Sequence, residues 1–270
     1  MTIADDFYYN GAHGYEYNVK LMLWDKKSSE DDKETGIDYD VLSGLPGASS
    51  SLLDYGVKIN EPIIIQGTLA KCPCYNNDDE HFYTLREQRY ILTWLTSDKN
   101  LHWLEFIDKE TEYVAYLCRV TSVKKKMFMG KVIGFDVTWT TNSVFAYSKE
   151  ITEHYSSATS LSISDWYCDS DDSDYLYPKM EITVRSSEIQ IEIENNYESR
   201  RSTLHNLTSG DVIQLDSVNR MITSKLDKNF KDDFNWYFPR FAPRCYSTIN
   251  ITGDCDITMK YRLPRRVGEY

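Results

Sequence analysis

The chain has 270 residues, 41% hydrophobic and 27% charged, a composition typical of a folded globular protein with room for two domains. Its 42 acidic residues outnumber its 30 basic residues and give a formal net charge of −12, which argues against broad binding to nucleic acid. The sequence has no apolar run long enough to span a membrane, and its acidic amino-terminal residues lack the apolar core of a secretion signal, so we expect the protein to fold in a cytoplasm.

The amino-terminal region predicts two strands that are separated by a long polar segment. The first strand is expected at residues 15–24 and the second at residues 57–71, with residues 63–65 buried on both faces. Residues 25–54 between them are acidic and rich in Ser and Gly, and a loop of this length is unusual inside a compact domain. Two interpretations remain open for this segment, a contact with a neighbouring subunit and a mobile loop without a partner.

A helix is expected to begin after Thr84, because Thr84 and Glu87 have the spacing of a capping box. In this motif each side chain accepts a hydrogen bond from the backbone N–H of the other residue. Ile91, Trp94 and Leu95 follow at helical spacing, and the turn-forming residues 97–100 end the helix.

Three strands are expected after this helix, at residues 101–107, 113–123 and 131–139. The hairpin turns between them are placed at residues 108–111 and at residues 124–126. In the last strand Ile133, Phe135, Val137 and Trp139 alternate with small or polar residues, which predicts one buried face.

The second half of the chain is β throughout, and the break between two domains is placed near residues 148–160, where strand alternation is lost. We therefore divide the chain into residues 1–148 and 149–270, which carry net charges of −7 and −5. Alternating apolar residues predict strands around residues 189–194 and 255–261, with turns at residues 195–196 and 209–211. Short strands at this spacing favour an antiparallel sandwich.

The order of these segments resembles the distal tail protein (Dit) of long-tailed bacteriophages. The resemblance is carried by the helix end WLTSDKN and the meander that closes on FDVTWTTNSVFAYS, with DFYYNGAHGYEYNVKL near the start and YLYPKMEITVRSSEIQIEIEN and LTSGDVIQLDSVNRMI in the second half. It implies a mainly β fold with one short α-helix, made of an N-terminal ring-forming (belt) domain, residues 1–148, and a C-terminal galectin-like antiparallel β-sandwich, residues 149–270.

The resemblance also implies a structural protein of the virion and not an enzyme. Its copies would assemble in the bacterial host cytoplasm into a homohexameric hub at the distal end of the tail. This hub would join the tail tube protein to the tail-tip or baseplate proteins and to the receptor-binding protein, with no cofactor, no membrane and no specific nucleic acid as partner. DNA would pass through the central channel, and the −7 on residues 1–148 predicts an acidic channel wall that repels phosphates.

Two alternatives from other functional classes stay open. One is a carbohydrate-binding module for host-surface glycans, since Trp166, His205, Asn206 and Arg220 are residue types that a galectin uses, although not in its order. The other is a tail-associated hydrolase with paired carboxylates, for which no segment supplies a recognisable site.

Several candidate metal or catalytic sites are weak. The five histidines lack the i, i+4 spacing of a helical metal site. Acidic residues 165–174 offer oxygens for Ca²⁺ but do not fit an EF-hand, which favours a solvated loop. Of the six cysteines, those at 118 and 255 are expected to be small buried apolar residues, and the pair at 72 and 74 has poor zinc spacing. A disulfide framework is not expected in a cytosolic chain.

The carboxyl-terminal region is the best candidate for an interface, because it interleaves aromatic residues with arginines. Phe234, Trp236 and Phe238 alternate and are expected to fill the core of a strand. The candidate interface residues, expected at a surface, are Phe241, Arg240, Arg244, Arg265 and Arg266.

Overall fold

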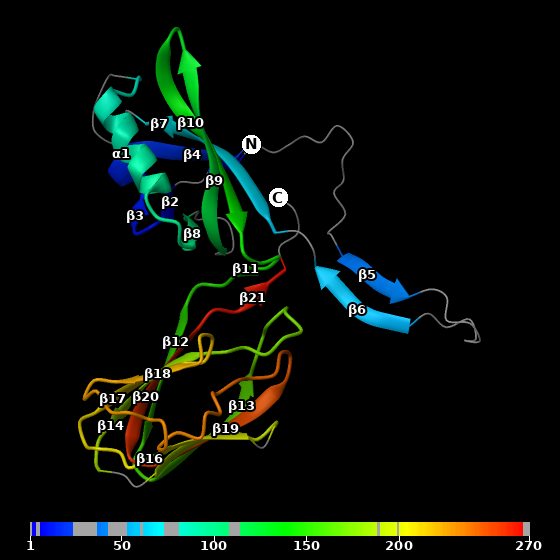
Figure 1. Cartoon of the computed structure of the whole chain (residues 1–270), viewed down its shortest axis with the longest axis vertical. Helices are drawn as coiled ribbons and strands as arrows, with labels where there is room; N and C mark the ends of the chain where they lie inside the picture. Colours follow the sequence, from blue (N-terminus) through cyan, green and yellow to red (C-terminus); the bar gives the residue numbers. More distant parts are fainter. Residues whose placement is uncertain are drawn as a thin grey trace. The chain divides into compact units, whose positions relative to one another are not determined.

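The computed structural model describes residues 2–3, 6–23, 37–42, 53–59, 62–72, 81–107, 114–187, 190–198 and 200–266. Side chains are described in the same ranges, except in residues 2–3, 23, 37–42 and 53–59. The chain divides into two compact units, one ending at Ala146 and one running from Tyr147 to Arg266, which are treated separately below (Figure 1). Antiparallel strands dominate both units, so the predicted mainly β fold is confirmed.

The first unit is built on a long antiparallel sheet. Its strands follow the order β1-β4-β7-β10-β9-β8-β2-β3. Their bounds are β1 Thr2–Ile3, β2 Asp6–Tyr9, β3 Ala12–His13, β4 Val19–Leu23, β7 Ile64–Lys71, β8 His102–Ile107, β9 Ala115–Phe128 and β10 Lys131–Thr141. The remaining elements are a 3-10 helix, Gly14–Tyr17, the helix α1, Leu85–Thr96, a separate hairpin of β5, Ile37–Leu42, and β6, Leu53–Ile59, and the short β11, Ala146–Tyr147.

The predicted capping box is present at the start of α1. The Thr84 backbone N–H donates to the Glu87 carboxylate at 2.6 Å, and the Glu87 backbone N–H donates to the Thr84 hydroxyl at 3.3 Å. The predicted apolar residues of the helix are buried, and the indole N–H of Trp94 donates to the carbonyl oxygen of Tyr9 at 2.9 Å. This bond fixes the helix against β2. No helix in the described part of the chain has the length and apolarity needed to cross a membrane.

The three strands expected after the helix are confirmed, but the predicted turn at residues 124–126 is wrong. β9 continues through these lysines to Phe128, and the chain turns at Met129 and Gly130, whose φ angles are 48° and 77°. Two consecutive positive φ angles define the tight turn that best matches the twist of a hairpin, and Gly130 adopts one of them at no steric cost. The turn expected at residues 108–111 lies outside the described residues.

A β-bulge changes the predicted buried face of β10. Phe135, Val137 and Trp139 are buried as expected, but Val132 is buried in place of Ile133. The register shifts between Val132 and Gly134, so one extra residue enters the strand and reverses the alternation before the shift.

Three predictions for the amino-terminal region are corrected. The expected strand at residues 15–24 is a 3-10 helix followed by β4, and the expected strand at 57–71 is split between β6 and β7. Within the latter, Ile64 is 55% exposed and is therefore not buried. The expected loop at 25–54 contains β5 and the start of β6, while the rest of this segment lies outside the described residues.

The second unit is an antiparallel sandwich of two sheets, ordered β12-β20-β14-β17-β18 and β13-β19-β15-β16. Their bounds are β12 Ile151–Ser157, β13 Ser160–Tyr167, β14 Lys179–Val184, β15 Gln190–Asn195, β16 Arg200–His205, β17 Val212–Asp216, β18 Met221–Ser224, β19 Tyr246–Thr252 and β20 Cys255–Tyr261, followed by the short β21 Pro264–Arg265. The segment expected to connect two domains, residues 148–160, therefore contains strand β12.

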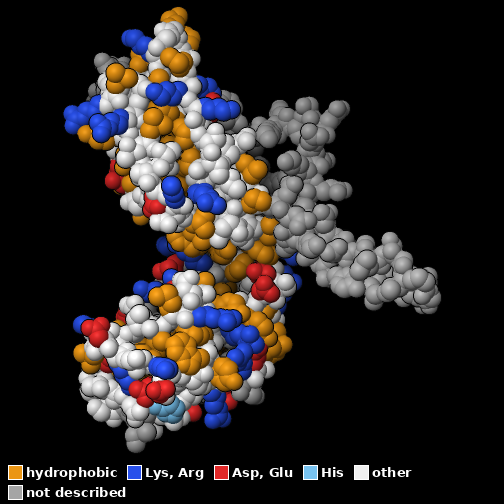
Figure 2. Space-filling view, in the orientation of Figure 1, with side chains coloured by type: hydrophobic (Ala, Val, Ile, Leu, Met, Phe, Trp, Pro, Cys, Tyr) orange, Lys and Arg blue, Asp and Glu red, His pale blue; other side chains and the backbone are white. Residues whose placement is uncertain are grey.

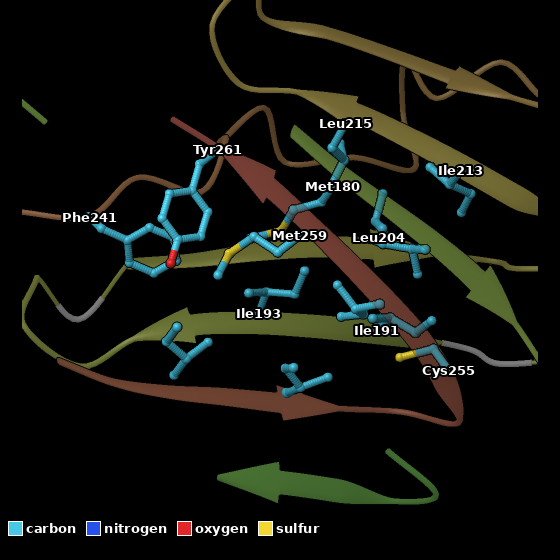
Figure 3. Close-up of a cluster of buried hydrophobic side chains, with 14 of the residues drawn as sticks. Met180, Ile191, Ile193, Leu204, Ile213, Leu215, Phe241, Cys255, Met259 and Tyr261 are labelled. Atoms are coloured by element: carbon cyan, nitrogen blue, oxygen red, sulfur yellow. The ribbon is translucent and has the colours of Figure 1, made fainter. Parts of the chain in front are cut away.

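The core of the sandwich comes from both sheets, as Figure 3 shows for Ile191 and Ile193 of one sheet and Met180, Met259 and Tyr261 of the other. The residues of β15 and β20 in this core follow the period of two that the sequence predicts for these strands.

Two of the cysteines are buried as the sequence predicts, and a third forms a disulfide bond that was not expected. Cys118 and Cys255 are fully buried, and burial raises the pKa of the Cys118 thiol to about 12. A thiol in this state is inert. Cys72, however, takes part in a disulfide bond, which the composition argument did not anticipate.

Candidate assembly surfaces

Arg240 forms a bidentate ion pair with Glu198 within the second unit. Its guanidinium donates two hydrogen bonds to Glu198, each at 2.8 Å, and lies 4.1 Å from the centre of the Tyr175 ring. These bonds lower the pKa of the Glu198 carboxyl and raise the pKa of Arg240. Arg240 therefore fixes the turn after β15 to the segment that precedes β19.

We expect Arg240→Lys to lower the free energy of unfolding of the second unit by about 1 kcal/mol, because an ammonium group cannot make the parallel bonds of a guanidinium. Urea titration followed by hydrogen exchange in β15 and β16 would measure this loss. A matched control is Arg200→Lys, in which the changed side chain lies over the Tyr237 ring without a bond to a carboxylate in the described part of the chain. If both variants lost the same free energy of unfolding, the Arg240–Glu198 pair would not have the stabilising role that we give it.

The acidic segment, as we call residues 165–174, binds arginines from the last part of the second unit. Arg265 donates to the carboxylate of Asp169 at 2.8 Å, and Arg244 donates to the carbonyl oxygen of Asp171 at 3.2 Å. The backbone N–H of Arg266 also donates to the Asp171 carboxylate at 2.9 Å. These pairs supply the acidic segment with positive partners from its own chain, and no group of three or more potential metal ligands occurs among the described residues.

The prediction that Phe241 lies at a surface is wrong. Phe241 is 1% exposed and lies in the buried cluster (Figure 3). Its ring centre lies 4.5 Å from that of Trp166, and its backbone pairs with that of Leu176. Trp236, which was expected in the core, is 53% exposed. The alternation rule fails because residues 231–240 are an irregular segment and not a strand. A contact of the four arginines with another subunit stays a prediction.

A band of exposed aromatic side chains runs over the end of the sheet that contains β13, β19, β15 and β16. We call it the aromatic band, and its members are Tyr167, Tyr246, Tyr197, Tyr237 and Trp236, each between 42% and 69% exposed. Tyr167 and Tyr246 face each other across β13 and β19 at 4.8 Å between ring centres. The guanidinium of Arg200 lies 4.6 Å from the centre of the Tyr237 ring.

Sequence reasoning missed this band, because its members come from three separate strand ends and one loop. The only local signal is the run of aromatic residues at 234–238. Exposed aromatic rings beside arginines have the composition of interface hot spots.

Two of the residue types that a galectin uses for sugar, Trp166 and Asn206, are bound to carboxylates of the second unit. Trp166 is 7% exposed and donates its indole N–H to Glu153 at 3.1 Å, so its ring does not offer a face for a sugar. Asn206 donates to Asp233 at 2.6 Å.

Two family models together match almost the whole chain. A model described as a phage tail protein N-terminal domain matches residues 2–143, and a model described as a phage tail C-terminal domain matches residues 145–261. The chain belongs to this family of phage tail proteins. Membership gives it a structural role in the tail, a place in the virion and no enzymatic activity, as the resemblance implied.

Solved structures give the fold. The chain is similar to the crystal structure of the SPP1 Dit protein, described as a paradigm of the hub adsorption apparatus in phages that infect Gram-positive bacteria. The identity is 9%, the match covers 97% of this chain and 100% of that chain, and the TM-score is 0.62.

A chain of the phage P2 baseplate, in its activated conformation with Ca, is similar at 11% identity and a TM-score of 0.50, over 89% of this chain and 90% of that chain. A comparison with curated proteins finds no match. The predicted resemblance to distal tail proteins is therefore confirmed at the level of the fold.

Proposed function

We propose that this tail protein is the distal hub of the tail, a homohexameric ring that joins the tail tube to the baseplate or tip and to the receptor-binding proteins. The observation that carries the proposal is the fold shared over 97% of the chain with a protein described as part of a hub adsorption apparatus. In this proposal, residues 1–148 form the ring, residues 149–270 form the galectin-like domain, and assembly takes place in the host cytoplasm.

The aromatic band is the surface of the second unit that we assign to docking of other tail proteins. Large aromatic side chains bury much area at a low cost in conformational entropy, and neighbouring arginines add directed hydrogen bonds. The Arg240–Glu198 pair holds Tyr175 beside the band and gives it a fixed shape.

We keep an acidic channel wall as part of the proposal, and the charges of the first unit indicate which segments would form it. Among the described side chains of the first unit, ten Lys and Arg stand against six Asp and Glu. The acidic surplus of residues 1–148 therefore resides in segments whose side chains lie outside the described residues.

The test of the proposed function is the mass of the purified protein by light scattering across a range of concentrations, with negative-stain images of the largest species. We expect a hexamer and six-fold rings with a central hole, either alone or when tail tube protein is added as a template. A monomer under every condition, including the template, would overturn the ring.

A carbohydrate-binding role is the second candidate, and the exposed rings of the aromatic band favour it, because tyrosine and tryptophan faces stack on sugars. Binding to a glycan array that is lost in Tyr246→Ala and Trp236→Ala would support it. No binding by the native protein would leave the docking role as the function of this surface.

A further inference from the structure

The hairpin of β9 and β10 ends in an exposed apolar tip. Met127, Phe128 and Met129 are 60%, 54% and 85% exposed, and Figure 1 shows the hairpin extending beyond the rest of the first unit. Soluble proteins rarely leave such contiguous apolar groups uncovered in their working state. Methionine is flexible and polarizable and packs well against aromatic partners.

Lysines surround this tip. Lys124, Lys125 and Lys126 precede it on β9, and Lys131 follows it on β10. Lys125 donates to the Gln88 side chain at 2.9 Å, and Lys131 lies 4.7 Å from the centre of the Phe82 ring. Asp136 lies 3.6 Å from Lys126 and offsets one of these charges. The surface that results has an apolar centre and a positive rim, and Figure 2 shows orange and blue side chains together at this end of the first unit. We call it the hairpin surface.

A surface of complementary chemistry lies at the edge of the same sheet, on β8, β2 and β3. The side chains of Phe7 and Tyr9 point into the core, so Asp6 and Tyr8 lie on the outer face. The Asp6 side chain is only 17% exposed, and its carboxylate binds Nδ1 of His13 at 2.8 Å. The register places Glu105 opposite Tyr8, and Ile107, 40% exposed, opposite Asp6.

Two further residues extend this face beyond the edge strand β3. Tyr15 stacks on His13 with ring centres 5.0 Å apart and is 48% exposed. Glu16 is exposed and accepts a hydrogen bond from the backbone N–H of His13. The acidic outer face, as we name it, consists of Tyr8, Tyr15, Glu16, Glu105 and Ile107.

We propose that the hairpin surface of one copy docks on the acidic outer face of the next copy, and that this head-to-tail contact closes the ring. The inference rests on the proposed function and names its interface. The lysines meet Glu16 and Glu105, and the methionines and Phe128 pack on the two tyrosines and Ile107. Opposite charges at the rim steer the encounter and fix the register, while the apolar centre supplies the burial.

We assign a second copy as the partner because the two surfaces carry opposite charge and belong to different strands of one sheet, so every copy presents both of them. A patch that meets a different patch gives a heterologous contact, and every copy then uses both surfaces. Repeated contacts of this kind form a ring when the rotation closes.

The test reverses the charge of the hairpin surface with Lys124→Glu and Lys126→Glu in one variant. We expect the concentration at which half the protein is assembled to rise by at least about tenfold, because like charges then face each other. A matched control carries Lys225→Glu and Lys231→Glu in the second unit, makes the same change in net charge, and should assemble like the native protein. Melting curves establish that each variant is folded.

A variant of the acidic outer face, with Glu16→Lys and Glu105→Lys, should lose assembly to the same degree. A mixture of this variant with the reversed hairpin variant should regain it, because each reversed surface then meets a complementary one in a ring of alternating copies. Met127→Ser with Met129→Ser should also weaken assembly, without any change in charge.

The outcomes separate this inference from the proposed function. Native rings together with unchanged assembly of both charge variants would overturn the interface and leave the hub role standing. Loss of assembly in each variant with no recovery in the mixture would also overturn the pairing of these two surfaces. A native protein that stays monomeric even with tail tube protein would overturn both proposals.

Discussion

Glu87→Gln should destabilise the first unit by about 2 kcal/mol, because it removes a carboxylate that pairs with a buried ammonium group. The side chain of Lys71 is 2% exposed, and its Nζ lies 3.0 Å from the Glu87 carboxylate. The same Nζ donates to the carbonyl oxygen of Phe82 at 3.1 Å. A glutamine at position 87 keeps an oxygen for the capping box, so the loss reports the charge pair. The expected loss of stability is smaller than for a fully buried ion pair because the Glu87 side chain is 32% exposed.

The control for this prediction removes the buried charge as well. Lys71→Met has a similar volume and no charge, so the double variant Lys71→Met with Glu87→Gln should recover most of the stability lost in Glu87→Gln alone. The measurement is hydrogen exchange of the α1 and β7 amides in native conditions, which reports the first unit separately from the second. A double variant that is less stable than Glu87→Gln would contradict the argument.

The same pair makes the first unit sensitive to acid. Burial alone would raise the pKa of Glu87, but the hydrogen bonds from Thr84 and the bond and charge of Lys71 outweigh it, so the pKa is lowered. A carboxyl group whose pKa is lowered by folding contributes stability that is fully present above its pKa in the unfolded chain, about 4.3. This stability is lost as the pH falls through the pKa of the group in the folded protein. The native protein should therefore lose this increment below about pH 4.3, and Glu87→Gln should not.

Phe241→Ala should lower the free energy of unfolding of the second unit by about 3–5 kcal/mol, the usual cost of removing a fully buried ring. Phe241 is 1% exposed and packs against Trp166 between the two sheets. Figure 3 shows its ring beside that of Tyr261 in the same core. The lost ring leaves a cavity that the surrounding strands cannot fill without moving.

Trp236→Ala is the matched control, since it removes a larger ring from the same segment. Trp236 is 53% exposed, so we expect a change within about 0.5 kcal/mol. Urea titration of the full chain, with hydrogen exchange in β13 and β19 as the readout, measures both variants. Comparable losses would mean that the ring of Trp236 is also part of the core, against the exposures observed.

The features that could be predicted from the sequence depend on short stretches of chain. The capping box of Thr84 and Glu87 is encoded within four residues, and the alternation of β15 and β20 within seven. The buried side chains of α1 follow from helical spacing alone. These predictions hold because backbone hydrogen bonding and the direction of each side chain are set locally.

The wrong predictions share a different origin. The hairpin turn was placed at three lysines because they are polar, but polar residues also fit the exposed end of a strand. The turn is at Met129 and Gly130, where the φ angles are positive. The bulge before Gly134 depends on pairing with β9, which no local pattern reports. Trp236 was assigned to the core by alternation in a segment that has no regular strand, and the burial of Phe241 depends on its pairing with distant Leu176.

The sequence by itself therefore determined the mainly β class, the single helix of the described part and the order of segments that led to the tail family. Only the tertiary structure decided which charged and aromatic residues meet. Arg240 pairs with Glu198, Arg265 pairs with Asp169, and the ring of Tyr167 contacts that of Tyr246. The two residues of each pair are more than forty positions apart in the sequence. Contacts of this kind depend on how strands from distant parts of the chain pair in a sheet, and that pairing is fixed by burial of the whole core and not by any one segment.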